Sequence, residues 1–115
     1  MLPTNFANLV TKPPDVHAQL EAIEQWCAAH RELAAIDPRR LANDVPIDPV
    51  ALTKALFLLV EKGVLEQVYR FETPAGYLLP DDYKSYRDIP DELYDRYNEA
   101  VSKSSGKVIP VFKGH

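Results

Sequence analysis

The segment ALTKALFLLVEKGVL, residues 51–65, decides the fold of this chain. In a helix of 3.6 residues per turn its apolar side chains recur on one stripe, which predicts a face buried in a core. This stripe consists of Leu52, Ala55, Leu56 and Leu59. The outward positions are also largely apolar, and they include Val50, Phe57, Leu58 and Val60. A helix that is apolar almost all round is normally covered, either by another part of the chain or by a partner.

Aspartate and proline mark where the helices begin. An aspartate carboxylate caps a helix by accepting from the free N–H groups of its first turn, and proline suits the first helical position. The residues that fit this pattern are Asp15, Asp37-Pro38 and Asp48-Pro49, and Gly63 fits the left-handed position that ends the third helix. The expected helices run from residue 15 to about 36, from 38 to about 43 and from 49 to 62.

The second half of the chain predicts strands and one more helix. Residues 64–73 are rich in β-formers, and Thr73-Pro74-Ala75-Gly76 is a turn that returns the chain along residues 77–79, which predicts a β-hairpin. Helical spacing of apolar residues predicts a fourth helix over about 90–101. The apolar segment 108–112 contains a proline, which restricts it to an edge strand or an extended arm.

Length and composition indicate one globular domain with a tail. The chain has 115 residues, of which 46% are hydrophobic and 26% charged. We expect an N-terminal arm over 1–14, the domain over 15–80 and a C-terminal extension over 81–115. No apolar run approaches the ~20 residues that cross a bilayer, and the first residues lack the apolar core of a secretory signal. Cys27 is the single cysteine, so no disulfide can form within one chain. From these three observations together we expect a cytoplasmic protein that contacts no membrane.

Residues from about 16 to 80 resemble the winged helix-turn-helix family, in the order helix, helix, turn, helix, hairpin. The resemblance rests on Leu41-Ala42, on the turn Val45-Pro46-Ile47, on the stripe of the third helix, and on residues 61–65. It implies an α+β fold with three helices and a two-stranded wing, to which this chain adds a C-terminal helix and an extended tail. In DNA-binding members the third helix enters the major groove. Carried onto this chain, those contacts fall on Val50, Ala51, Thr53, Lys54, Phe57 and Leu58.

This contact face departs from what DNA requires. Among those positions only Thr53 and Lys54 offer side-chain hydrogen bonds, the wing tip 73–76 has no arginine or lysine, and the net charge is −4. Something must cover the apolar side chains, and either the C-terminal segment of the same chain or a protein partner would do so. The candidate interface consists of Val50, Phe57, Leu58, Val60, Ile109 and Phe112.

The sequence contains little that would indicate a catalytic site or a metal-binding site. The three histidines are far apart and not paired with Cys27 at any zinc-ligand spacing, and no phosphate-binding glycine loop is present. We therefore expect no enzymatic activity and no cofactor or metal. Six tyrosines lie between residues 69 and 97, and tyrosine is favoured at interfaces as well as in packing.

These observations suggest two functions of different classes, and we favour a protein interaction module over the alternative. Its partner is another protein or a second copy of the chain, bound through the third helix and the tail. The alternative is a transcription regulator that binds duplex DNA through Arg39, Arg40, Thr53, Lys54 and Arg70. A ligand-sensing regulator with an aromatic pocket between wing and tail is a third hypothesis that the sequence leaves open.

Overall fold

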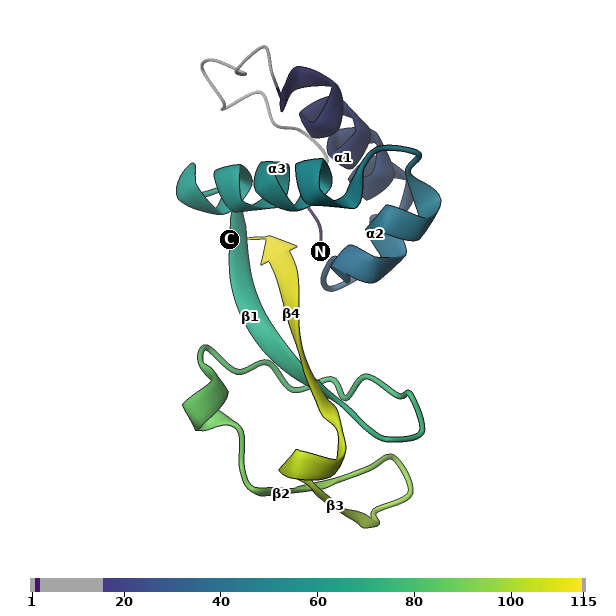
Figure 1. Cartoon of the computed structure of the whole chain (residues 1–115), viewed down its shortest axis with the longest axis vertical. Helices are drawn as coiled ribbons and strands as arrows, with labels where there is room; N and C mark the ends of the chain where they lie inside the picture. Colours follow the sequence, from purple (N-terminus) through teal and green to yellow (C-terminus); the bar gives the residue numbers. More distant parts are fainter. Residues whose placement is uncertain (1, 3–15, 115) are drawn as a thin grey trace. The chain divides into compact units, whose positions relative to one another are not determined.

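The computed structural model describes Leu2 and residues 16–114, which form two compact units. The helical unit comprises Met1–Glu66 and Phe112–His115, and the strand unit comprises Gln67–Val111. The elements carry the labels of Figure 1. The predicted arm over 1–14 and the predicted cap at Asp15 lie outside the described residues, apart from Leu2, which is buried in the core of the helical unit.

Helix α1 (His17–Ala29) turns its apolar stripe inward, as its sequence predicts, but it is shorter than expected. The predicted end near Ile36 is wrong by seven residues. His30 already leaves helical geometry, with φ −125° and ψ 40°. Ile36 instead forms an antiparallel bridge with Phe112, in which the N–H of each residue donates to the carbonyl of the other. That pairing requires extended backbone, so tertiary pairing overrides the helical spacing of the sequence.

Helices α2 (Pro38–Asp44) and α3 (Pro49–Glu61) confirm the Asp-Pro pattern. The Asp37 carboxylate accepts from the backbone N–H of Arg39 at 2.9 Å, and the Asp48 carboxylate accepts from that of Ala51 at 3.1 Å. Gly63 follows α3 with φ +76°, a left-handed conformation that favours glycine. The boundaries of both helices therefore follow from local chemistry.

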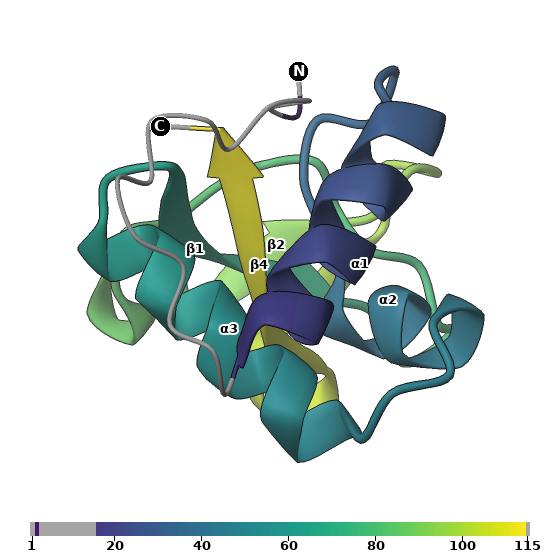
Figure 2. The same cartoon turned by 90° about the horizontal axis from the view of Figure 1, so that it is seen from above.

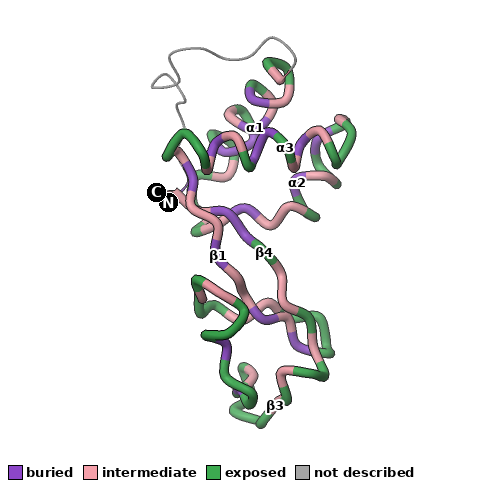
Figure 3. The backbone as a smooth tube through the Cα atoms, turned by 60° about the vertical axis from the view of Figure 1, so that its left-hand side comes forward, coloured by how far each residue is buried: buried purple, intermediate pink, exposed green. Residues whose placement is uncertain are grey.

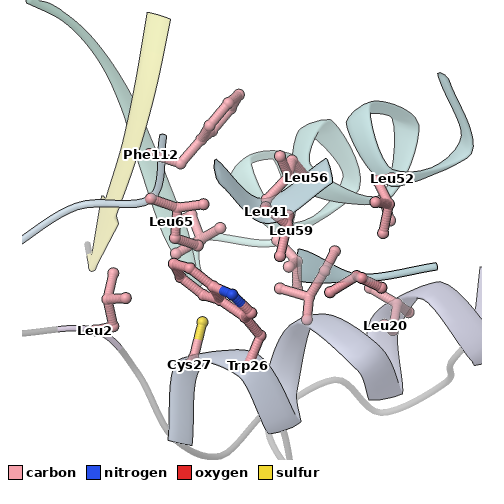
Figure 4. Packing of buried hydrophobic residues seen from close by; sticks show 14 residues of the cluster. Leu2, Leu20, Trp26, Cys27, Leu41, Leu52, Leu56, Leu59, Leu65 and Phe112 are labelled. Carbon is pink, nitrogen blue, oxygen red and sulfur yellow. The ribbon is translucent and has the colours of Figure 1, made fainter. Parts of the chain in front are cut away.

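The core of the helical unit lies between α1, α2 and α3, which Figure 2 shows from above. Figure 4 shows that α1 contributes Leu20, Trp26 and Cys27 to this core, opposite the apolar stripe of α3. Trp26 also anchors α2, because its indole N–H donates to the Asp44 carboxylate at 2.9 Å. Phe112, from the other end of the chain, completes the same core.

Strand β1 (Leu65–Glu72) pairs with β4 (Lys107–Gly114), a partner that the sequence did not predict, and the predicted return along 77–79 pairs with β1 only through isolated bridges. The turn at 73–76 does form, since the Gly76 N–H donates to the Thr73 carbonyl at 2.9 Å and Gly76 has φ +92°. Beyond it, the returning chain bonds to β1 through the bridges Glu72–Leu78 and Tyr69–Tyr83, and the Leu79 N–H donates to the Phe71 carbonyl at 2.9 Å. Pro80 lies between these two bridges and has no N–H to donate, so the returning chain pairs through isolated bridges and forms no continuous strand.

The predicted fourth helix over about 90–101 is wrong, because those residues form β2 (Glu92–Tyr94) and β3 (Ala100–Ser102). The two strands are antiparallel, with Leu93 opposite Val101. The Asp95 carboxylate closes the turn between them by accepting from the N–H groups of Tyr97 and Glu99, each at 2.9 Å. The helical spacing of Leu93 and Val101 thus serves a cross-strand contact instead.

The strand unit has its own small core around Phe71, Ile89 and Leu93. Two short 3-10 helices, η2 (Tyr86–Asp88) and η3 (Lys103–Ser105), lie in its connecting segments. In the strand unit, Figure 3 shows short buried stretches between half-buried and exposed ones. In the described part of the chain, no helix is long and apolar enough to span a bilayer.

Candidate protein-interaction surface

One face of α3 is exposed to solvent along its length. Its members are spaced three or four residues apart, which places them on one side of the helix. We call Val50, Lys54, Phe57 and Glu61 the α3 face, and all four are exposed. Val50 is 61% and Phe57 49% exposed, which are large fractions for apolar side chains. The core stripe, in contrast, is buried as the sequence predicts.

The tail covers only part of this face. The Phe112 ring meets the Phe57 ring edge to face, with centroids 5.8 Å apart and planes at 75°. Phe112 is only 1% exposed and belongs to the core. Its ring therefore shields part of Phe57, while about half of Phe57 and most of Val50 remain exposed. The C-terminal strand thus buries its own Phe112, but Val50 and Phe57 of α3 remain in contact with water.

None of the remaining candidate interface residues is exposed. Leu58 and Val60 are half-buried and pack against the core of the helical unit. Ile109 is half-buried and belongs to the strand unit. Of the six candidates, the exposed ones are Val50 and Phe57.

The residues of the DNA alternative are partly engaged in other contacts. The Arg39 guanidinium pairs with the Asp37 carboxylate at 2.9 Å. Burial acts to raise the pKa of Asp37, but hydrogen bonds from Arg39 and the charges of Arg39 and Arg40 outweigh burial and hold that pKa below its ordinary value. Thr53 donates its hydroxyl to the Pro49 carbonyl at 2.9 Å. Arg40 lies 6.0 Å from the centroid of the Trp26 ring.

The last two DNA candidates differ in their surroundings. Arg70 belongs to the strand unit, where its Nε donates to the Asp82 carboxylate at 2.6 Å, and both side chains are largely covered. Lys54 is exposed on the α3 face. A phosphate would therefore compete with existing carboxylate partners at Arg39 and Arg70.

A group of polar and aromatic side chains in the strand unit escaped the sequence reasoning. Arg96 lies between Tyr77 and Tyr97 and donates to both of their hydroxyls. The expected helix over 90–101 concealed this group, because these residues form a turn between two strands instead. The clustering of tyrosines in this half was the available signal. Within the described ranges no cluster of three His, Cys, Asp or Glu residues is placed to hold a metal ion.

No protein-family model matches the chain, and no solved structure matches it significantly.

Proposed function

We propose that this protein is a winged-helix domain that works as a protein interaction module through the α3 face. The fold part is supported by the order of α1, α2, a short turn, α3 and then two paired strands, β1 and β4. Residues 73–106 separate these strands, so the wing in this proposal is that entire segment rather than a tight hairpin.

The exposure of Val50 and Phe57 on one helix face carries the functional part. Complete burial of a large apolar side chain stabilises by roughly 1.5–3 kcal/mol, so both side chains favour a partner that covers them. They are seven residues apart, which at 1.5 Å per residue corresponds to about 10 Å along the helix. Lys54 and Glu61 add charged groups of both signs beside them, as at the rim of protein interfaces. The partner in this proposal is a protein surface with two apolar pockets at that spacing.

The first experiment asks whether a second copy of the chain is that partner. Size-exclusion chromatography with light scattering compares wild type with Val50→Glu and Phe57→Glu. Ala18→Glu is the matched control, because it adds the same charge at an exposed position of α1. If self-association is the function, both α3 variants turn a dimer into a monomer while the control does not. Circular dichroism checks the fold of each variant.

The second experiment asks whether another protein occupies the face. A photo-cross-linking amino acid is placed at position 50 of the full chain in the producing cell, and at position 18 as control. We expect a discrete cross-linked protein from position 50 that Phe57→Glu removes. Equal cross-linking from both positions, with no dimer in solution, would refute the proposal. Unfolding of both Val50→Glu and Phe57→Glu would also refute it, since the face would then belong to the core.

DNA binding is the competing outcome. Electrostatic binding to duplex DNA loses affinity with salt at a log–log slope of about −0.9 for each phosphate neutralised. Salt-dependent binding that Lys54→Ala weakens and Val50→Glu leaves intact would favour the regulator over the interaction module.

A further inference from the structure

The strand unit contains an open pocket of about 350 Å³ that is separate from the α3 face. Its walls come from the turn that follows β1 and from the turn between β2 and β3, so it lies within one unit. Pro74, Ala75 and Val101 supply apolar wall. Tyr77 and Tyr97 line it as well, and they are 42% and 65% exposed.

Arg96 is held in this pocket by two aromatic rings. Its Nη2 donates to the Tyr77 hydroxyl at 2.8 Å and to the Tyr97 hydroxyl at 2.6 Å. Its Cζ lies 3.8 Å from the centroid of the Tyr77 ring and 4.9 Å from that of Tyr97. An exposed arginine normally loses side-chain entropy when it binds a ligand. Here the rings already restrict the guanidinium, so less of that entropy remains to be lost.

The group presents hydrogen-bond donors. Each tyrosine hydroxyl accepts from Arg96, which leaves its own hydrogen to be donated outward. Nη2 makes both of these bonds, so the N–H groups of Nε and Nη1 are further donors. Among the described residues no carboxylate forms an ion pair with Arg96. A set of donors around an unpaired positive charge is complementary to an anion.

The neighbouring acidic groups limit the charge of that anion. Asp95 and Glu99 line the same pocket, and the Asp95 carboxylate is held in the turn by backbone N–H groups. Their two negative charges oppose a dianion such as a phosphate monoester more than a monoanion. The apolar walls and the tyrosine rings favour a ligand with an apolar body.

We propose that this pocket binds a carboxylate attached to an apolar or aromatic group, with Arg96 and the hydroxyls of Tyr77 and Tyr97 as its donors. Two sources offer this chemistry, a free organic acid and the C-terminal residue of a peptide. The site is independent of the proposed role of α3.

The test is an NMR titration of the full chain labelled with ¹⁵N. The probes are 3-phenylpropanoate, its neutral amide and phenyl phosphate. We expect saturable shifts of the Arg96 Nε–H and of the backbone amides lining the pocket, with a Kd on the order of 1 mM for the carboxylate. The amide should bind at least about tenfold more weakly than the carboxylate, because it lacks the charge. N-acetylphenylalanine, compared with 3-phenylpropanoate, distinguishes the sources, since tighter binding of the former assigns the site to peptide ends.

Variants locate the binding. Arg96→Gln should abolish the carboxylate preference, and Tyr97→Phe should weaken binding several-fold while it retains the ring. Tyr94→Phe is the matched control, because Tyr94 is equally exposed in the same unit but lies outside this pocket. Three results would overturn the proposal: no saturable shift with wild type, equal binding of carboxylate and amide, or tighter binding of phenyl phosphate. An equal effect of Tyr94→Phe and Tyr97→Phe on binding would also overturn the proposal. This comparison can be made even if Arg96→Gln fails to fold.

Discussion

A side chain at Gly106 would meet tight packing, and Gly106→Ala should destabilise the strand unit. A methyl group at this position would overlap the Phe71 ring and the backbone carbonyl oxygen of Glu72. Phe71 is completely buried, so its ring has no solvent to move into, and the carbonyl belongs to β1. The backbone of Gly106 is extended, with φ −113° and ψ −159°, so alanine would suffer no conformational strain of its own. The cost is therefore one of overpacking.

The size of the effect follows from two opposing contributions. Overpacking of a close-packed core costs about 1–3 kcal/mol, and alanine recovers about 0.4–1 kcal/mol by restricting the unfolded chain. We expect the free energy of unfolding to fall by about 1–2 kcal/mol. With a urea m-value of about 1–3 kcal/mol/M, this moves the unfolding midpoint down by roughly 0.5–1 M.

Two measurements check this expectation. Urea denaturation followed by far-UV circular dichroism reports the midpoint. Hydrogen exchange reports the strand unit directly, because the Leu79 N–H donates to the Phe71 carbonyl at 2.9 Å and should exchange about 5–30 times faster. The double-mutant cycle with Phe71→Leu is the control, since a smaller side chain removes the overlap with the ring, leaves that with the Glu72 carbonyl, and so should lower the cost of Gly106→Ala. Equal cost of Gly106→Ala in both backgrounds, or no cost at all, would refute the reasoning.

Three further predictions concern the helical unit. Burial raises the pKa of the Cys27 thiol to about 12, so a disulfide reagent at neutral pH should label this thiol only after the protein unfolds. Rapid labelling of the native protein would contradict the burial of Cys27. The pKa of Asp37 is lowered in the folded state, so its stabilising contribution is present above the unfolded value of about 3.9 and is lost as the pH falls through the lower folded value. Acid titrations of stability should show this loss in wild type and not in Asp37→Ser, which keeps a capping oxygen without the charge. Phe112→Ala should destabilise by about 3–5 kcal/mol, measured by urea denaturation, whereas a loss below about 1 kcal/mol would place that ring outside the core.

The sequence predicted those parts of the fold that depend on local chemistry. Asp37 and Asp48 cap α2 and α3 because a carboxylate next to a proline needs only the first turn of its own helix. Gly63 ends α3 for an equally local reason, its positive φ. The buried stripe of α3 was predictable because apolar periodicity reports one face of one element.

The errors came where a distant segment determines the local structure. Ile36 is extended because Phe112, 76 residues later in the sequence, pairs with it. Leu93 and Val101 have a spacing that suits a helix, yet they face each other across β2 and β3. The Asp95 carboxylate makes that turn by binding backbone N–H groups, a use of aspartate that competes with helix formation. Apolar spacing alone does not distinguish these two outcomes.

The candidate site was predictable to the same extent and for the same reason. Periodicity separates the outward from the inward side of α3, and Val50 and Phe57 are exposed on the outward side. It does not say which outward residue another segment of the chain covers, and that is decided by Phe112.

The two paired strands explain why one tail residue matters for both fold and surface. Strand β1 begins with Leu65 in the core of the helical unit and contributes Phe71 to the core of the strand unit. Strand β4 likewise packs Val108 against the second core and buries Phe112 in the first. Phe112 is held by its backbone pairing with Ile36, and its ring packs against Phe57 while Val50 stays exposed. A protein that binds the α3 face would therefore contact Val50 and the part of Phe57 that the Phe112 ring leaves exposed.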